Sequence, residues 1–113
     1  MSKRIFIVYG HHNTEKSFNA SVRDTFIEEA EKLGHKIDLI NLHNEKSLPF
    51  FDGSAPTDQI LDYRRRLEKS DVLFMISPCY NLRATAILEN WIDLTLAPKW
   101  FFSFKRLVGN WGY

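Results

Sequence analysis

The sequence predicts an α/β domain whose parallel strands are joined by helices, and three observations lead to that prediction. Short apolar runs alternate with longer segments in which apolar residues recur every three or four positions, in the order β-α-β-α-β-α. The most apolar run, residues 72–76, is bounded by polar residues, which is typical of a strand covered on both faces. A polar loop and an amphipathic segment follow that run directly. Such alternation implies parallel strands connected by right-handed crossovers.

The first half of the chain begins with a strand, a polar loop and a helix. Residues 4–9 form the expected strand, after which Gly10 lets the backbone turn. A helix is expected over residues 18–33, with Ser17 or Thr14 as its N-terminal cap. The apolar stripe of this helix comprises Phe18, Val22, Phe26, Ala30 and Leu33.

Glycine and proline mark the boundaries of the next elements. Gly34 is expected to end the first helix as a residue with positive φ. The strand predicted over residues 36–42 alternates more strongly and is therefore expected at an edge of the sheet. Residues 43–56 are expected to form a loop, because two prolines and a glycine interrupt them. A second helix should open at Thr57 and run to about Lys69. Its apolar positions are Ile60, Leu61, Tyr63 and Leu67.

The third helix should begin near Ala84 and end after Leu96, because the residue before Pro98 is disfavoured in helical conformation. Residues 99–113 are expected to form an aromatic loop. The apolar stripe of the third helix comprises Ile87, Leu88, Trp91, Ile92 and Thr95.

Three strands are few for this architecture, in which sheets commonly have about five. If the strand order is 2-1-3, residues 72–76 become an open hydrophobic edge, which invites pairing with another strand. We therefore expect residues 1–113 to form a single but incomplete domain, with that edge covered by another chain or by the rest of a longer one.

Composition excludes several classes of function. The net charge of +1 gives no electrostatic case for binding nucleic acid or an anionic membrane. No apolar segment is long enough for a membrane span, and no signal peptide is visible at the N-terminus. A single cysteine, Cys79, rules out an internal disulfide and makes the cytoplasm the default compartment.

Two polar loops follow buried strands and should lie at the same edge of the sheet, where α/β proteins bind ligands. The first, residues 10–19, ends at a helix N-terminus, which favours a phosphate; Thr14, Ser17 and Asn19 could add side-chain donors. The alternative is that Ser17 merely caps the helix and the histidines are solvated. No glycine fingerprint for phosphate is present, so the phosphate hypothesis rests on position.

The second loop, Ser77 to Leu82, combines backbone amides with the flat ring of Tyr80. That combination suits the edge and face of a planar heterocycle. The alternative is an ordinary turn in which Tyr80 packs against a neighbour.

Other reactive side chains have simpler interpretations. Cys79 lacks a histidine and aspartate pattern around it, so we expect a small buried or half-buried cysteine. The adjacent His11 and His12 have no supporting ligands for a metal. The three arginines at residues 64–66 should form a solvated helix face. Trp91 is expected in the core or in a subunit interface.

The two loops, VYGHHNTEKSFN and SPCYNLRATAILENWID, together resemble the flavodoxin-like NAD(P)H:quinone oxidoreductases, which include the FMN-dependent azoreductases. Members carry a histidine-containing loop leading to Ser-Phe-Asn, which Ser17, Phe18 and Asn19 match. Asn81 resembles the azoreductase version of the second motif. The other matching positions of that motif are Pro78, Tyr80, Leu88, Trp91, Ile92 and Asp93. The resemblance covers nearly the whole chain and implies a three-layer sandwich with sheet order 2-1-3 that lacks the usual fourth and fifth strands.

The resemblance also implies a non-covalently bound flavin, FMN or FAD. Its phosphate would be held by His11 or His12 together with Ser17, Phe18 and Asn19. Its ring would lie against Pro78, Cys79, Tyr80 and Asn81. The reaction would pass hydride from NAD(P)H to the flavin and then to a quinone-like or azo acceptor, without a catalytic side chain. Members of this family work as homodimers with the site near the interface.

Three other functions are alternatives to this one. Members continue into a fourth strand, whose following loop completes the flavin site, so the alternative is a non-catalytic binding or regulatory module. A phosphoacceptor receiver domain would need acidic residues where this chain has Tyr9-Gly10 and Ser77-Pro78. A thioredoxin-like domain would need a Cys-x-x-Cys pair.

Overall fold

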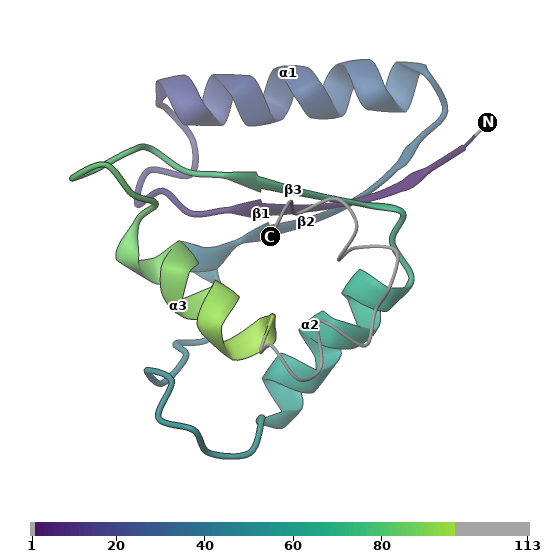
Figure 1. Ribbon diagram of the computed structural model, residues 1–113. Coiled ribbons are helices and arrows are strands. Elements are labelled where there is room, and N and C mark those ends of the chain that lie inside the picture. Colours follow the sequence, from purple (N-terminus) through teal and green to yellow (C-terminus); the bar gives the residue numbers. More distant parts are fainter. Residues whose placement is uncertain (1, 97–113) are drawn as a thin grey trace.

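The computed structural model describes residues 2–96, which form a three-layer α/β arrangement (Figure 1). The three strands are parallel and lie in the order β2-β1-β3, as predicted, with Val8 of β1 paired to both Ile40 and Met75. The aromatic loop expected over residues 99–113 lies outside the described residues. The elements are β1 (Arg4–Tyr9), α1 (Phe18–Lys32), β2 (Lys36–Asn41), the 3-10 turn η1 (Leu42–Asn44), α2 (Asp58–Glu68), β3 (Val72–Ile76) and α3 (Ala86–Thr95).

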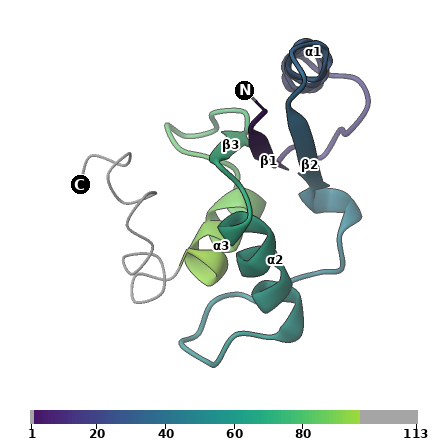
Figure 2. The same ribbon diagram turned by 90° about the vertical axis from the view of Figure 1, so that its right-hand side faces the viewer.

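Strand β1 lies at the centre of the molecule and contributes side chains to two cores. Helix α1 covers one face of the sheet, and α2 and α3 cover the other (Figures 1 and 2). Ile5, Ile7 and Tyr9 point towards α1, whereas Phe6 and Val8 point towards α2 and α3. This division follows from the alternation of side chains along a strand. The core between the sheet and the helices α2 and α3 contains Trp91, which is fully buried. The centre of its ring lies 6.1 Å from that of Phe6.

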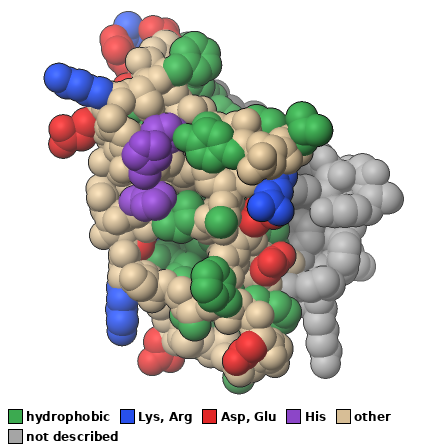
Figure 3. Space-filling model, turned by 90° about the vertical axis from the view of Figure 1, so that its left-hand side faces the viewer, with side chains coloured by type: hydrophobic (Ala, Val, Ile, Leu, Met, Phe, Trp, Pro, Cys, Tyr) green, Lys and Arg blue, Asp and Glu red, His purple; other side chains and the backbone are tan. Residues whose placement is uncertain are grey.

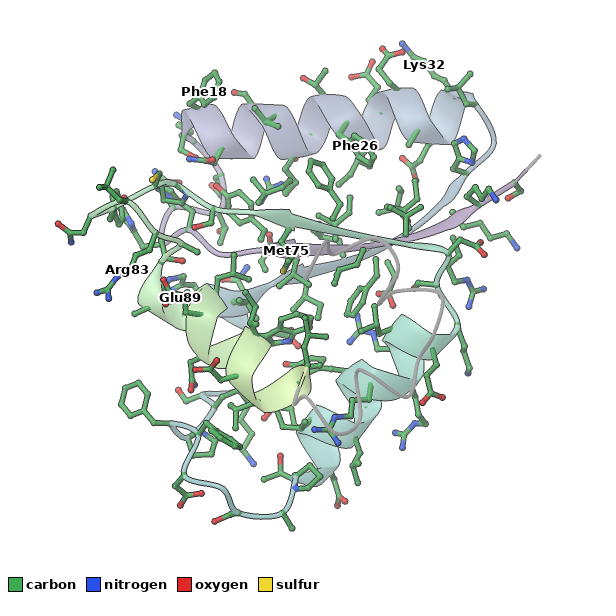
Figure 4. The ribbon with its side chains drawn as sticks, viewed as in Figure 1. Phe18, Phe26, Lys32, Met75, Arg83 and Glu89 are labelled. Carbon is green, nitrogen blue, oxygen red and sulfur yellow. The ribbon has the colours of Figure 1, made fainter. Side chains whose placement is uncertain are left out.

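The predicted apolar stripe of α1 is correct only in part. Phe18 is 82% exposed, and Val22 and Leu33 are exposed as well. Ala30 of the predicted stripe is buried and Phe26 is half-buried, but the other buried residues of the helix, Ala20 and Arg23, lie outside the stripe. A stripe that advances four residues at each step drifts around the helix by roughly 40° per step, whereas a helix lying along a sheet buries positions that average 3.6 residues apart. Figure 4 shows Phe18 pointing away from the sheet and Phe26 pointing towards it.

Strand β3 is less covered than its sequence suggested. Val72 is 41% exposed and only Ile76 is buried, because β1 is its only neighbour among the strands of residues 2–96. The continuous apolar run therefore belongs to an edge strand. This outcome agrees with the expectation that the order 2-1-3 leaves residues 72–76 as the open edge.

The arginines of α2 do not form the expected solvated face. Consecutive helix residues point about 100° apart, so the three side chains reach different neighbours. Arg66 makes two hydrogen bonds to Asp38 of β2, at 2.9 and 2.6 Å. Arg64 donates to the carbonyl oxygens of Leu94 and Thr95 at the end of α3. Only Arg65 is directed mainly to solvent, where it pairs with Asp62 on the same helix.

Smaller differences between the expected and the observed structure concern the ends of strands and helices. Strand β2 stops at Asn41, because Leu42 turns into η1 within the region expected to be a loop. Helix α3 begins at Ala86, two residues later than expected, because Arg83 pairs with Tyr80 in a tight turn. Among residues 2–96, no helix has the length and apolar character needed to cross a membrane.

Candidate functional site

The structure brings the two polar loops together at the carboxyl end of the sheet. Because β1 and β3 pair in parallel, the loops that follow them begin side by side, on the left of Figure 1. The Gly10 N–H donates to the carbonyl of Ile76 at 2.8 Å. The Thr85 hydroxyl, just before α3, donates to the carbonyl of Gly10 at 2.7 Å. The loops therefore share one hydrogen-bonded junction.

Gly10 is needed at this junction for its lack of a side chain. A Cβ atom at this position would lie 2.9 Å from the Cβ of Leu88 and 3.1 Å from the Thr85 hydroxyl oxygen. Its φ is outside the positive region that Gly34 adopts. Gly10 was expected to let the chain turn, and the structure shows that it instead allows the close approach of α3 to the end of β1.

The Ser17 hydroxyl is fully used within the fold. The Tyr9 hydroxyl donates to the carbonyl of Asn13 at 2.8 Å, and a carbonyl can only accept. The contact of 2.9 Å between Tyr9 and Ser17 must therefore be donated by Ser17. Ser17 also accepts from the Ala20 N–H at 2.9 Å, as the N-terminal cap of α1. It has no proton left for a ligand, so its role is to fix the loop.

The free donors at this end of α1 are on the backbone. The first N–H groups of a helix have no partner within the helix. Among the hydrogen bonds within residues 2–96, none uses the N–H of Phe18 or Asn19. The first turn carries no acidic residue, so the positive end of the helix dipole is not compensated there. This end of α1 is thus suited to an anion.

A buried arginine supports the same loop from behind. Arg23 is 6% exposed, and its guanidinium lies 4.6 Å from the centre of the Tyr9 ring. It donates to Asn41 at the end of β2 and to the neighbouring Asp24. These contacts fix Tyr9, which in turn holds Asn13 and Ser17. Neither Tyr9 nor Arg23 was selected from the sequence, although Tyr9 stands at a strand end, where such a role is common.

The two histidines differ in their surroundings. His11 is buried, and its Nδ1 accepts the N–H of Asn13 at 2.8 Å. A neutral imidazole that accepts at Nδ1 carries its proton on Nε2, which can then donate to a ligand. His12 is exposed and stacks on His11 with ring centres 4.3 Å apart. The expectation of solvated histidines therefore holds for His12 and not for His11. Within the part of the chain that the structure describes, no cluster of three potential metal ligands occurs.

The second loop contains an unusual turn. Tyr80 and Arg83 exchange two backbone hydrogen bonds of 3.1 Å, and the residues between them, Asn81 and Leu82, have φ of 51° and 62°. Asparagine tolerates this left-handed region, whereas it is costly for leucine, and such strain is often found at functional sites. No hydrogen bond within the described part of the chain uses the N–H of Cys79 or Asn81. The loop thus offers unused backbone donors.

Cys79 is exposed, which contradicts the expectation of a buried or half-buried cysteine. It lies between β3 and the turn, in a segment without regular secondary structure that projects beyond the sheet (Figure 1). Tyr80 is about half exposed, so the alternative of a ring packed into a neighbour holds only in part. Its ring and His12, from the other loop, line the same pocket of about 550 Å³.

The chain matches a known protein family and curated relatives. Residues 3–112 match a protein family described as having a flavodoxin-like fold. The chain is 24% identical to ribosyldihydronicotinamide dehydrogenase [quinone] of Rattus norvegicus over 125 residues, which is 88% of the chain but 54% of the relative. The chain thus spans about half the length of the curated relatives that it matches.

Solved structures show the same fold. An NAD(P)H:quinone oxidoreductase from Methanothermobacter marburgensis superimposes with a TM-score of 0.73 at 22% identity, covering 85% of this chain and 54% of that one. An FMN-dependent NADH-azoreductase from Bacillus anthracis, solved with FMN, gives a TM-score of 0.66 at 17% identity, covering 80% of this chain and 54% of that one. At these identities the likeness concerns the fold.

Proposed function

Because the chain belongs to this family of flavodoxin-like fold, we propose that it binds a flavin where its two polar loops meet and serves in a flavin-dependent oxidoreductase. The reaction is hydride transfer from NAD(P)H to a quinone-like or azo acceptor through FMN or FAD. The relatives are named as quinone or azo reductases, which supports this reaction class. The observation that carries the proposal is the meeting of two sets of unused backbone donors at one edge of the sheet.

The donors present fit the phosphate of a flavin. The N–H groups of Phe18 and Asn19 have no partner within the described residues, and His11, in the loop that leads to them, has its Nδ1 engaged by the Asn13 N–H, which leaves Nε2 for a ligand. Ser17, expected to donate to the phosphate, instead holds this set in place through Tyr9. Backbone N–H groups at a helix start are a common phosphate site, and the helix dipole adds to them.

The second loop fits the polar edge of a flat heterocycle. The turn at Asn81 and Leu82 holds the N–H groups of Cys79 and Asn81 free of other partners. Pro78 and the ring of Tyr80 give the loop a flat, partly apolar surface. A bound flavin would supply the two-electron chemistry, while these residues bind and orient it and limit the access of water.

The proposal extends to a homodimer that acts in the cytoplasm. A second copy would cover the open side of β3, which has no strand beside it among residues 2–96. The single, exposed Cys79 is consistent with a reducing compartment.

A second candidate is a binding or regulatory module without turnover. It would hold a ligand with the same unused backbone donors, and it differs from the first proposal in that the bound chain would not oxidise NAD(P)H.

Calorimetric titration with FMN and with riboflavin tests the proposal. FMN should bind at least tenfold more tightly than riboflavin, because only FMN offers a phosphate to α1. Asn19→Ala should reduce this preference, whereas the exposed Ser21→Ala on the same helix should leave it unchanged. If neither compound binds, or both bind equally, the flavin site is refuted. FMN binding without NAD(P)H oxidation would favour the module.

A further inference from the structure

A segment without regular secondary structure, residues 45–57, joins η1 to α2 below the sheet (Figure 1). Figure 3 shows acidic and hydrophobic side chains exposed together on this lower part of the molecule. The segment contains Asp52 followed by Gly53, the only position in the sequence where an aspartate or asparagine precedes glycine. Asp52, Gly53 and the following Ser54 are all exposed. In such a pair the side-chain carboxyl group and the next backbone nitrogen are near enough along the chain to react with each other.

Gly53 leaves its backbone nitrogen accessible. Within the described part of the chain, no hydrogen bond uses the Gly53 N–H. A Cβ atom at this position would have no atom beyond its chain neighbours within 4 Å, and the φ of 86° is one that glycine adopts without strain. The nitrogen is therefore neither engaged by a partner nor shielded by a side chain.

The carboxyl group of Asp52 is held beside this nitrogen. The Ser54 N–H donates to Oδ1 of Asp52 at 2.9 Å, so the side chain folds back over Gly53 in a turn closed between side chain and backbone. The same neighbour also restrains a reaction, because hydrogen bonds from the Ser54 hydroxyl and N–H keep the pKa of Asp52 below its ordinary value. An ionised carboxylate reacts poorly with a nucleophile, since it lacks the proton with which an oxygen leaves as water. Any reaction therefore passes through the protonated fraction.

The other aspartates are placed so that the same reaction is hindered. Most of them lie in helices, where the N–H of the next residue points along the helix axis and away from the side chain. These are Asp24, Asp58, Asp62 and Asp93. Asp38 lies in β2, where Arg66 binds its carboxylate at 2.9 and 2.6 Å. The carboxylate of Asp71 accepts the N–H of Arg4 at 2.9 Å. Asp52 is thus distinguished both by its sequence and by its surroundings.

We infer that Asp52 is a site of spontaneous backbone isomerisation. The Gly53 nitrogen forms a bond to the carboxyl carbon of protonated Asp52, and one carboxyl oxygen leaves as water with the carboxyl proton and the N–H proton. The product is a cyclic imide, which a second water opens. When this water adds to the former main-chain carbonyl, the original peptide bond breaks and the chain continues through the side chain as isoaspartate. Water is the only other reactant, and nothing is oxidised or reduced.

The change affects the fold because the segment is fixed on both sides of Asp52. The Phe51 N–H donates to the Asn90 side chain at 3.2 Å, and Thr57 caps α2 by accepting the N–H of Ile60. Isoaspartate inserts one methylene group into the main chain between these two points. The longer chain must either bulge into solvent or pull on the Asn90 contact. The inference concerns the chain itself and does not depend on flavin binding.

Incubation of the full 113-residue chain in mildly acidic water enriched in heavy oxygen, followed by peptide mapping, tests the inference. Each passage through the imide adds one heavy oxygen atom to the residue, whichever way the ring opens. The peptide that contains Asp52 should therefore gain label over days. The peptides that contain the other aspartates are internal controls and should stay unlabelled. Labelling of Asp52 should be slower at neutral pH, because a smaller fraction of its carboxyl group is protonated there.

Variants at the two following residues should act in opposite directions. Gly53→Ala should slow the labelling several-fold, because a side chain hinders the approach of the nitrogen. Ser54→Ala should accelerate it at neutral pH, because the pKa of Asp52 rises when the hydrogen bond from the hydroxyl is lost. The matched change Ser47→Ala, at an exposed position of the same segment, should leave the rate unchanged. Absence of label at Asp52, equal labelling of all aspartates, or wild-type rates in both Gly53→Ala and Ser54→Ala would overturn the inference.

Discussion

At the residue scale, the donors available to a ligand depend on which hydroxyl protons already form hydrogen bonds within the protein. Ser17 and Tyr9 are both hydroxyl residues beside a possible phosphate site, and either could be taken for a ligand. Their hydrogen bonds leave neither with a free proton, because Tyr9 donates to Asn13 and Ser17 donates to Tyr9. The pair therefore shapes the loop, and the ligand is left to other donors, first of all the backbone N–H groups of Phe18 and Asn19.

This arrangement predicts that Tyr9→Phe and Ser17→Ala are coupled. Each should lower the free energy of unfolding by about 1 kcal/mol, because each removes a hydrogen bond or cap. The free energy of unfolding lost in the double variant should be smaller than the sum of the two single losses by at least about 0.5 kcal/mol. The reason is that both changes remove the same contact. Urea unfolding of the four proteins measures this difference. Strict additivity would show that the two hydroxyls act separately.

A second residue-scale prediction concerns Tyr63 at alkaline pH. Burial raises its pKa from 10.0 to about 12, with a further contribution from the carboxylate of Glu45. A raised pKa means that the folded state binds the proton more tightly, so this contribution to stability is present below pH 10 and is lost as pH rises towards 12. The urea midpoint should fall over that interval. Tyr63→Phe should show a smaller fall, and an equal fall in both proteins would contradict the assignment.

At the scale of elements, local signals in the sequence predicted the order of strands and helices but not every contact surface. Ser17 and Thr57 cap helices as expected, and Gly34 ends α1 with a φ of 83°. These features depend on neighbouring residues alone. The buried face of α1 could not be found in this way, because Arg23 becomes buried through partners on β1 and β2.

The position of the candidate site was predictable from the sequence, but its detailed geometry was not. Parallel pairing places the ends of β1 and β3 together, so the meeting of the two loops followed from the alternation of elements. The exposure of Cys79 and the role of Thr85 were not predictable, because they depend on a turn with two positive φ values and on the approach of α3 to Gly10.

The arginines of α2 give a prediction about how helices are joined. Arg64 donates to two carbonyls at the end of α3, where a positive charge also interacts favourably with the helix dipole. Arg64→Gln should lower the free energy of unfolding by about 1–2 kcal/mol. The matched change Arg65→Gln, on the exposed side, should stay within about 0.5 kcal/mol of wild type. Equal effects in urea unfolding would refute the structural role of Arg64.

At the scale of the whole molecule, the main feature is an asymmetry between the two edges of the sheet. Strand β2 is tied to α2 by Arg66 and to α1 by Arg23. Strand β3 has β1 on one side and, among residues 2–96, no strand on the other. Its apolar side chains are only partly covered. An edge of this kind readily pairs with another strand.

We therefore predict that the 113-residue chain self-associates through β3. Sedimentation velocity over a concentration series should show a dimer or larger species. Val72→Lys should shift the equilibrium towards monomer, because a charge on an edge strand opposes pairing and Val72 is 41% exposed there. The matched change Val22→Lys, at an exposed position on α1, should leave the association unchanged. A wild-type chain that stays monomeric at every concentration, or equal effects of the two lysines, would rule out β3 as the contact and with it the proposed covering of this edge by a second copy.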